Sequence, residues 1–382
     1  MNAAGKESDN PRRQLSQARK IVVKLGSAVL TDRHGDLDSR FFFRLAGQIS
    51  RARERGCHIA LVTSGAVAAG MKRINAGQQP GSIPQKQAAA AVGQSYLMWL
   101  YERAFGRWGM MVAQVLLTHE DFKERKRYLN SWHTLTTLLT LGVVPVINEN
   151  DTVAVEEIML GDNDNLSAML ASLLEADLLI MLSDVEGLYQ QDPRRVANAR
   201  LIPIVEEVGA DIERQACGPP GHKGVGGMLT KIQAAGVATK AGIATVIANG
   251  RTRDVITRIL AGEEIGTLFL PQKGRLTKRK HWIAFVLRPK GALEIDRGAQ
   301  EAILKRGKSL LASGIIGVSG RFDRGDAVDI LSGRDVTFAR GLSNYSASEL
   351  ERIKGLKSSA IEDKLGYKHL DEVIHRDNLV IW

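Results

Sequence analysis

The sequence contains only two cysteines, Cys57 and Cys217, among its 382 residues. Two cysteines form no disulfide framework and lack the paired spacing of a zinc site, so a reducing compartment fits the chain. The sequence also lacks an apolar run of the roughly 20 residues that a membrane-spanning helix needs. Its polar N-terminus has no apolar core of a signal peptide. We therefore expect a cytoplasmic protein without a membrane partner.

Hydrophobic and charged residues are present in ordinary amounts, 44% and 25% of the chain. This composition is typical of a soluble globular protein, and the length predicts two domains. Basic residues are in excess, with a formal net charge of +10 and a pI near 9.6. Such a charge favours anionic partners such as nucleotides, acidic metabolites or nucleic acid. Taken alone, a merely basic surface explains it better.

Short apolar runs alternate with helix-like segments between residues 19 and 270. The helix-like segments include Gln85 to Phe105 and Leu166 to Leu174. The apolar runs are nearly continuous, which is typical of parallel strands covered on both faces; they are Ile21–Gly26, Ile59–Gly65, Val143–Asn148, Leu178–Asp184 and Ala244–Gly250. This pattern predicts an α/β fold, a three-layer α/β/α sandwich with a mostly parallel sheet. Ligands of such folds bind at the carboxyl ends of the strands.

Three further segments flank this domain. Residues 1–18 are predicted to form a disordered arm, and residues 271–280 a basic linker that contains no acidic residue. Residues 281–382 contain short strand-like pieces separated by glycines, followed by a helical or irregular tail. They predict a small β-rich second domain.

The ends of the predicted strands carry polar groups. Lys24 lies within a buried strand, which is costly unless an anion pairs with it, although its amine could also reach water from the strand end. Gly26 lets the backbone approach a ligand closely. After the next strand, Ser64 leads into a helix whose first N–H groups could bind an anion, or it serves as a helix cap.

Glycines 224, 226 and 227 precede a helix that is predicted to begin near Met228, with Lys231 in its first turn. Glycines before a helix with a lysine in its first turn could bind phosphate, but the segment lacks the P-loop pattern GxxxxGK[ST]. A flexible loop is the alternative. Ser183 and Asp184 end another strand. They could hold a nucleotide or form a plain turn.

Two polar runs are NENDT at Asn148–Thr152 and GDNDNLSA at Gly161–Ala168. Asn165 is predicted to cap a helix that begins at Leu166, which leaves Asp162–Asp164 unexplained. Amides and carboxylates can bind the α-amino and α-carboxylate groups of an amino acid, and a carboxylate can orient lysines that would otherwise repel. Together with the lysines and glycine turns, these runs indicate a phosphoryl-transfer site.

The motifs VVKLGS, VTSGAVAAG, VPVINENDTVA, GDNDNLSA, SDVEGLY with DPR, and GVGGMLTK followed by IQAA occur in this order. In these motifs the chain resembles the glutamate 5-kinase family of the amino acid kinase superfamily, over roughly residues 19–375. The segment KSLLASGIIGVSGRFDRGDAVDI, Lys308–Ile330, resembles a PUA domain.

The resemblance implies an activity and its partners. ATP would phosphorylate the γ-carboxylate of L-glutamate to give L-glutamyl 5-phosphate and ADP, the first step of proline biosynthesis. Mg²⁺ would accompany ATP, and we name no protein residue as its ligand. Homo-oligomer formation and inhibition by proline are also implied by the resemblance.

The resemblance assigns roles to residues as well. Lys24 and Lys231 would neutralise charge on the transferred phosphoryl group, and Asp164 would organise the two lysines. Glutamate would bind to Ser64, Asp151 and Asn163. ATP would bind to Lys24, Gly26, Ser183, Asp184, Val225, Gly226, Gly227, Met228, Leu229, Thr230 and Lys231. The family commonly has threonine where this chain has Val225, so one hydroxyl is missing while the backbone donors of the glycines remain.

Two alternatives stay open. A kinase of the same fold could act on another small acid, such as aspartate, acetylglutamate or carbamate, although NENDTVA and GDNDNLSA match the glutamate 5-kinase pattern. An RNA-binding or RNA-modifying protein would agree with the PUA-like region and the basic linker. The N-terminal domain, however, shows no site for RNA modification.

Overall fold

The structure is a computed structural model that describes residues 10–74, 82–153, 163–193, 196, 198–209, 211–213, 227–272, 280, 283, 287–332 and 336–381. The chain divides into two compact units, Met1–Arg275 and Leu276–Trp382. Within the described residues, no helix has the length and apolar character needed to cross a membrane.

The N-terminal unit is built on a sheet whose strands occur in the order β3-β4-β2-β1-β5-β7-β8-β6. All neighbouring strands are parallel except β7 and β8, which are antiparallel. The strands are β1 (Lys20–Leu25), β2 (His58–Val62), β3 (Val112–Leu117), β4 (Val144–Glu149), β5 (Leu178–Ser183), β6 (Ile204–Val205), β7 (Ala244–Asn249) and β8 (Thr267–Phe269). The predicted mostly parallel sheet is confirmed.

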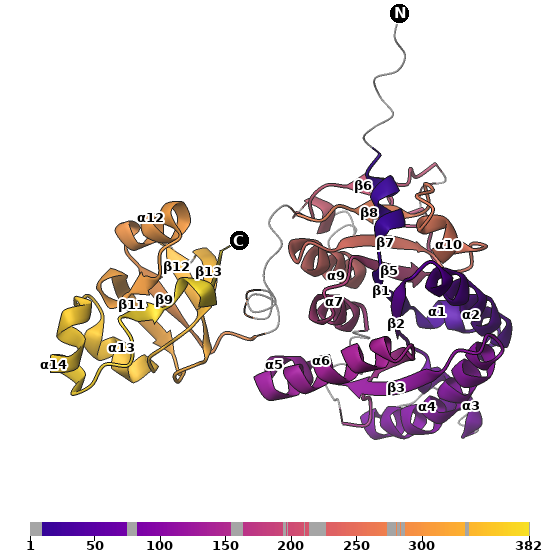
Figure 1. Ribbon diagram of the computed structural model, residues 1–382, viewed down its shortest axis with the longest axis horizontal. Coiled ribbons are helices and arrows are strands. Elements are labelled where there is room, and N and C mark those ends of the chain that lie inside the picture. Colours follow the sequence, from indigo (N-terminus) through magenta and orange to yellow (C-terminus); the bar gives the residue numbers. More distant parts are fainter. Residues whose placement is uncertain are drawn as a thin grey trace, which may run out of the picture. The chain divides into compact units, whose positions relative to one another are not determined.

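Helices cover both faces of this sheet. Figure 1 shows α1, α2 and α10 on one side of the strands and α7 and α9 on the other, which makes three layers. The helices are α1 (Ser27–Leu30), α2 (Ser39–Glu54), α3 (Ala66–Arg73), α4 (Ile83–Gly106), α5 (His119–Lys123), α6 (Arg125–Thr140), α7 (Asn163–Leu173), α9 (Met228–Lys240) and α10 (Val255–Ile259). The central strands are buried on both faces because of this cover, and β4 and β5 are buried along their whole length. This explains their continuous apolar sequences.

Five predicted strands and the predicted helices at 85–105 and from Met228 are present, with shifts of a few residues at their ends. One local prediction is wrong: Asn165 lies inside α7, which begins at Asn163, and is not a cap. Sequence patterning also did not single out β3, β6 and β8. The short β6 and β8 lie together at one edge of the sheet, where two or three residues give no periodicity.

The predicted disordered arm is wrong for its described part. Residues Pro11–Gln17 form a 3₁₀ helix that Asn10 caps by accepting a hydrogen bond from the Arg12 amide. The guanidinium of Arg12 is buried and donates hydrogen bonds of 2.8 Å to the carbonyl oxygens of Pro203, Ile265 and Gly266. A single arginine thus joins the N-terminal segment to carbonyls beside β6 and β8. Residues 1–9 lie outside the described residues.

The C-terminal unit contains a sheet of strand order β11-β9-β12-β13-β15 and a small β10-β14 pair. Its elements are β9 (Gly291–Ile295), α12 (Arg297–Arg306), β10 (Leu310–Leu311), β11 (Ile315–Gly320), β12 (Ala327–Ser332), β13 (Val336–Leu342), α13 (Ala347–Ile353), α14 (Ile361–Leu365), β14 (Glu372–Ile374) and β15 (Leu379–Ile381). The β-rich second fold expected from the sequence is confirmed, and its tail ends in a strand of the main sheet. Most of the expected basic linker lies outside the described residues.

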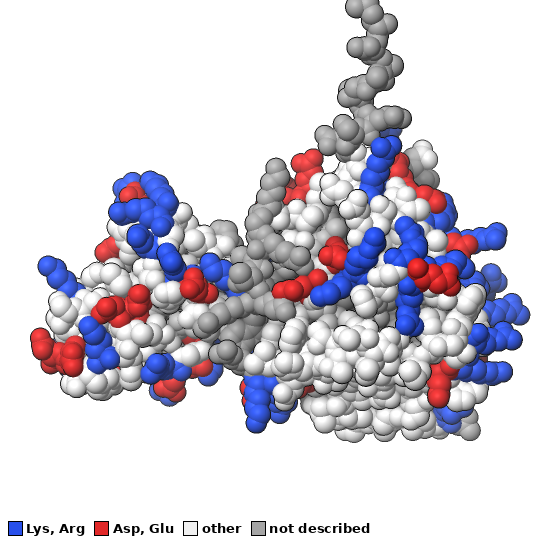
Figure 2. Space-filling model, viewed as in Figure 1, with Lys and Arg blue, Asp and Glu red and all other residues white. Residues whose placement is uncertain are grey.

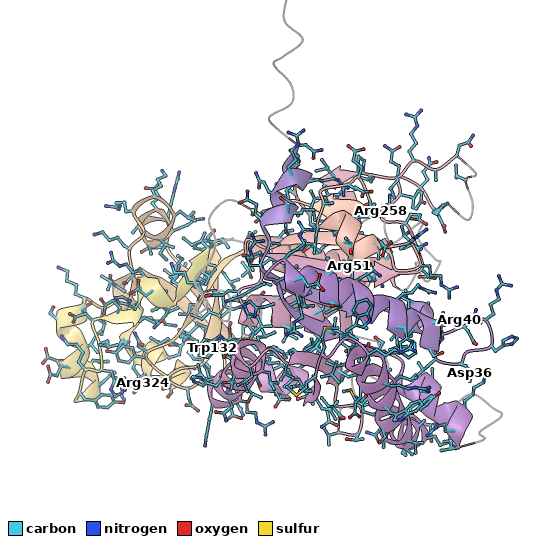
Figure 3. The ribbon with its side chains drawn as sticks, turned by 45° about the vertical axis from the view of Figure 1, so that its right-hand side comes forward. Asp36, Arg40, Arg51, Trp132, Arg258 and Arg324 are labelled. Atoms are coloured by element: carbon cyan, nitrogen blue, oxygen red, sulfur yellow. The ribbon has the colours of Figure 1, made fainter. Side chains whose placement is uncertain are left out.

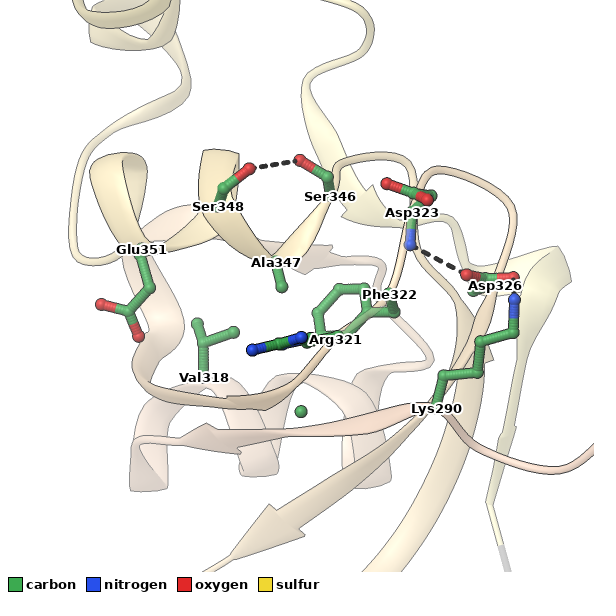
Figure 4. Close-up of a pocket in the computed structure, with 11 residues that line it drawn as sticks. Lys290, Val318, Arg321, Phe322, Asp323, Asp326, Ser346, Ala347, Ser348 and Glu351 are labelled. Carbon is green, nitrogen blue, oxygen red and sulfur yellow. Dashed lines mark hydrogen bonds and ion pairs between the residues drawn. The ribbon is translucent and has the colours of Figure 1, made fainter.

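A surface cavity of about 470 Å³ lies in the C-terminal unit between the β11–β12 loop and α13 (Figure 4). Its lining carries both signs of charge: Arg321 lies across it, while Asp323 and Glu351 border it and Lys290 pairs with Asp326 at 2.7 Å. This mixture gives no preference for an anionic chain such as RNA at this cavity.

Surface charge is uneven on the N-terminal unit. In Figure 2, Lys and Arg side chains gather over the side where α1 and α2 lie, whereas an uncharged area covers the region of α3, α4 and β3. Some of the basic groups are paired: Arg51 of α2 forms an ion pair with Asp254, and Arg258 of α10 forms one with Glu263. Figure 3 labels the two arginines. Part of the excess of basic residues therefore lies on the side of the N-terminal unit that α1 and α2 cover.

Candidate active site

Two lysines and one aspartate lie in direct contact at the carboxyl end of the sheet. Lys24 Nζ lies 2.6 Å from Asp164 Oδ1, and Lys231 Nζ lies 3.1 Å from Asp164 Oδ2. All three residues are buried. Two cations and one carboxylate leave one net positive charge in this buried cluster, so it is suited to an anion.

Three elements that are distant in the sequence bring these groups together. Lys24 is the penultimate residue of β1, Asp164 lies in the first turn of α7, and Lys231 in the first turn of α9. Both helices therefore direct their N-terminal ends toward β1, where helix dipoles favour negative charge. The arrangement is typical of a site for phosphate groups.

Thr230 and Gly227 complete the contacts of this cluster. Thr230 Oγ1 donates to Asp164 Oδ2 at 2.7 Å, and Lys231 Nζ donates to the Gly227 carbonyl at 2.8 Å. Asp164 Oδ2 thus accepts from a hydroxyl and an ammonium, while its other oxygen contacts Lys24. The carboxylate is held in one orientation by three donors from two elements.

Burial and charge act in opposite directions on these groups. Burial alone would raise the pKa of Asp164, but the charges of Lys24 and Lys231 outweigh it, and the pKa is lowered below its ordinary value. Burial lowers the pKa of Lys24; Asp164 opposes this effect and Lys231 adds to it. Asp164 is therefore ionised at neutral pH, as its role between two cations requires.

A chain of carboxamides adjoins this cluster, because Asn163 immediately precedes Asp164. Asn163 Nδ2 lies 3.2 Å from both Ser64 Oγ and Asn148 Oδ1, and Asn148 Nδ2 donates to Gln94 Oε1 at 2.9 Å. Ser64 follows β2 and Asn148 is the penultimate residue of β4. The structure therefore brings the predicted residues Ser64 and Asn163 together and adds Asn148 and Gln94 to them.

Close packing of α3 on α4 sets the position of Gln94. A Cβ atom on Gly70 would lie 1.7 Å from the Ala89 carbonyl oxygen, and one on Gly93 would lie 1.8 Å from that of Ala66. The two helix backbones therefore touch at these glycines, which only glycine permits. Gly65, at φ 97°, makes the left-handed turn into α3 just after Ser64.

The predicted nucleotide residues at β1 and β5 also lie close together. A Cβ on Gly26 would be 3.3 Å from the Leu182 carbonyl oxygen and 4.0 Å from the Ser183 Cα. Ser183 Oγ donates to Asp184 Oδ1 at 3.0 Å. Since β1 and β5 are neighbours in the sheet, Gly26 and Ser183 lie beside the Lys24 end of the lysine cluster.

Comparisons with known proteins agree with this geometry. The amino acid kinase family model matches residues 19–249, and the PUA domain model matches residues 291–365. The chain belongs to the amino acid kinase family. A glutamate 5-kinase of Caldanaerobacter subterraneus subsp. tengcongensis is 51% identical over 95% of this chain and 97% of the relative. A second glutamate 5-kinase, from Pelobacter propionicus, is 50% identical over 97% of this chain and 100% of the relative.

The resemblance to glutamate 5-kinases with a C-terminal PUA domain is thereby confirmed for this amino acid kinase. The remaining predicted residues are placed as follows. Asp151 lies in the turn after β4 and Asp184 is exposed after β5, while Met228 and Leu229 begin α9. Val225 and Gly226 lie outside the described residues, as does Asp162. The roles of these residues stay predictions.

No metal cage is evident in the described part of this amino acid kinase. Among those residues, no group of three or more His, Cys, Asp or Glu side chains is placed to hold a metal ion. Asp164 already contacts two lysines and a threonine. The described residues therefore do not fit a metal held by the protein alone.

Gln94 and Asn148 are the site residues that sequence reasoning missed. Asn148 was seen only as part of a polar run at a strand end. Gln94 is the one amide in the run AAAAVGQSYL of α4, and a buried amide in such an apolar run requires a hydrogen-bond partner. That signal was available, but its partner on β4 could not be known without the fold.

Proposed function

We propose that the protein transfers the γ-phosphoryl group of ATP to the γ-carboxylate of L-glutamate, giving L-glutamyl 5-phosphate and ADP, the first step of proline biosynthesis. The observation that carries this proposal is the buried contact of Lys24 and Lys231 with Asp164. We propose glutamate as the substrate because glutamate 5-kinases are about 50% identical to this protein over nearly the whole chain.

The chemistry needs no general base. A γ-carboxylate has a pKa near 4.3 and is ionised at neutral pH, so it can attack phosphorus directly. Catalysis then depends on alignment of the two substrates and on neutralisation of charge that develops on the phosphoryl oxygens. Lys24 and Lys231 would supply that neutralisation from opposite sides of Asp164, which keeps them close despite their repulsion.

Glutamate would bind on the side of the amide chain. Ser64 and Asn163 are joined there by a hydrogen bond, which supports their predicted roles. Asp151, in the turn after β4, would pair with the substrate ammonium. A carboxylate and several amides suit a zwitterionic amino acid better than they suit a second phosphate.

ATP would bind on the side of β1, β5 and α9. Gly26, Ser183 and Asp184 lie at neighbouring strand ends, and residues Gly227–Lys231 form the N-terminal end of α9, where backbone N–H groups are available to phosphates. Val225 and Gly226 are proposed to extend this phosphate contact through their backbones. The missing threonine hydroxyl at Val225 should not abolish ATP binding.

Mg²⁺ would reach the site with ATP. It prefers octahedral oxygen coordination and commonly keeps several waters while it is held by substrate phosphates. We propose this mode because the described residues offer no set of acidic ligands for it. When bound, Mg²⁺ supplies additional neutralisation of phosphate charge.

The central experiment is a hydroxamate assay with L-glutamate and ATP, which traps the acyl phosphate, alongside detection of ADP. Product should require both substrates and Mg²⁺. Addition of proline tests the proposed feedback inhibition in the same assay. Lack of glutamate-dependent product, together with turnover of aspartate, acetylglutamate or carbamate in a substrate panel, would replace glutamate by another small acid.

Two proposed partners concern other surfaces. Self-association is supported by exposed apolar side chains on α4 and beside the edge strand β3, namely Val92, Trp99, Trp108 and Met111. RNA binding by residues 276–382 is proposed as a secondary property because of the PUA match and the basic charge. Salt-sensitive retention of RNA by that unit would support it, and absence of retention at low salt would exclude it.

A further inference from the structure

Gln94 occupies the far end of the carboxamide chain from the lysine cluster. It projects from α4, is 8% exposed, and accepts a hydrogen bond at Oε1 from Asn148 Nδ2 at 2.9 Å. Asn148 in turn accepts from Asn163 Nδ2 at 3.2 Å. Starting from the lysines, the side chains therefore follow one another in space in the order Asp164, Asn163, Asn148 and Gln94.

Among the residues that the structure describes, each end of this row of carboxamides has a buried polar atom without a hydrogen-bond partner. At one end it is the donor Gln94 Nε2, and at the other the acceptor Asn163 Oδ1. Buried amide groups are nearly always satisfied, so two unsatisfied atoms at the two ends of one network call for partners from a bound molecule, either a ligand or an ordered water. The lysine cluster beside Asn163 places that ligand at the proposed glutamate site.

The hydrogen bonds that join the three carboxamides Asn163, Asn148 and Gln94 also have a direction. If the amide of Asn148 alone were reversed, its nitrogen would face the nitrogen of Asn163 and its oxygen would face the oxygen of Gln94. The orientations of the three amides are therefore linked, and one free donor at Gln94 goes with one free acceptor at Asn163. An α-amino acid offers the matching pair, since its carboxylate accepts and its ammonium donates.

We propose that Gln94 is a substrate-binding residue that donates from Nε2 to the α-carboxylate of the acceptor amino acid, while Asn163 Oδ1 accepts from its α-ammonium. This proposal rests on the proposed phosphorylation of glutamate. The γ-carboxylate must lie near Lys24 and Lys231 to be phosphorylated, so the carboxylate at the distant end of the chain is the α-carboxylate. Gln94 thereby selects for a free α-carboxylate.

Two substitutions of Gln94 test whether its Nε2 donor binds the substrate. Gln94→Glu keeps an oxygen that accepts from Asn148 but replaces the donor by a second carboxylate oxygen with its negative charge. Gln94→Met removes the donor and the acceptor without adding a charge. Either variant should raise the KM for L-glutamate by about tenfold or more, the effect of losing a hydrogen bond to a charged group. The KM for ATP should change by less than about twofold. Asn130→Asp, an amide-to-acid change on the exposed surface of α6, is the matched control and should change neither KM.

Substrate analogues test which carboxylate is bound. 4-Aminobutyrate has the amine and the terminal carboxylate of glutamate but no α-carboxylate, whereas L-glutamine keeps the α-groups and lacks the terminal carboxylate. Both are used as competitive inhibitors of the wild-type protein and of the Gln94 variants. Inhibition by L-glutamine should weaken about tenfold in Gln94→Glu, and inhibition by 4-aminobutyrate should stay within about twofold.

A binding measurement keeps this inference distinct from the proposed function. The shift in melting temperature caused by L-glutamate alone is measured for wild type and variants, after circular dichroism shows that each is folded. Wild type that neither binds nor phosphorylates glutamate would refute the proposed function itself. Active wild type with an unchanged KM in folded Gln94→Glu and Gln94→Met would refute the role of Gln94. Weakened 4-aminobutyrate with unchanged L-glutamine would assign Gln94 to the γ-carboxylate and overturn the α-carboxylate assignment.

Discussion

Replacing Asp164 by asparagine removes the carboxylate that contacts both Lys24 and Lys231 and keeps nearly the same side-chain shape. The two lysines are buried, with exposed side-chain fractions of 6% and 9%. Removal of one partner from a buried ion pair costs about 3–5 kcal/mol because the remaining charge stays buried without compensation. Here two cations lose the same partner, so we expect the upper half of that range.

The expected loss is large enough to measure by thermal unfolding. At about 2–4 °C per kcal/mol for a domain of this size class, the melting temperature should fall by roughly 8–20 °C. Saturating ATP and Mg²⁺ should recover part of this loss, because the phosphates would restore negative charge beside the lysines and ligand binding stabilises the folded state. The kcat should fall by about 10²–10³ because the lysines are no longer held in place.

The pH dependence supplies an internal check. The pKa of Asp164 is lowered in the folded protein, so its contribution is fully present above the unfolded value of about 3.9 and is lost as the pH falls through the folded value. The Asp164 carboxylate stays ionised from pH 5 to 8, so its protonation should reduce the difference in stability between wild type and Asp164→Asn only in stronger acid. Asp36→Asn, which breaks the exposed Asp36–Lys72 pair, is the control and should cost less than about 1 kcal/mol. An Asp164→Asn protein as stable as this control at pH 7 would refute the reasoning.

Four further changes test the division of roles. Lys24→Ala and Lys231→Ala should each lower kcat by about 10²–10³ with a much smaller rise in the KM for glutamate; near-normal kcat in a folded variant would remove that lysine from the mechanism. Asp151→Asn should raise the KM for glutamate about tenfold, from a lost charge-assisted hydrogen bond, and leave that for ATP almost unchanged; the reverse pattern would assign Asp151 to the nucleotide. A chain shortened to Arg275, the end of the N-terminal unit, should still phosphorylate glutamate; a folded but inactive product, judged by circular dichroism, would show that the second unit completes the site.

The parts of the fold that patterning predicted are those with strong local signals. The buried strands β1, β2, β4, β5 and β7 are continuous apolar runs, and α4 and α9 are long helices. The 3₁₀ helix at Pro11–Gln17 has no such signal, since it is short and polar. Its order depends on Arg12 reaching carbonyls some 190 to 250 residues away in the sequence, which no local pattern reveals.

The candidate site shows the same distinction. Lys24, Asp164 and Lys231 were assigned from motifs, and the structure brings all three into contact. Gln94 was missed because its relevance depends on the contact between α3 and α4 and on the register of β4. The motifs describe which residues are present, whereas the linked orientation of the amides exists only in three dimensions.

The glycine contact between α3 and α4 has a consequence for redesign of the acceptor specificity. Gly70 and Gly93 leave no room for even one methyl group between the helices. A substitution at either glycine would separate α3 from α4 and shift Ser64 and Gln94 at once, so the pocket would lose its shape instead of gaining a new one. Libraries aimed at longer or shorter dicarboxylic amino acids should therefore keep both glycines fixed and vary side chains along the amide chain.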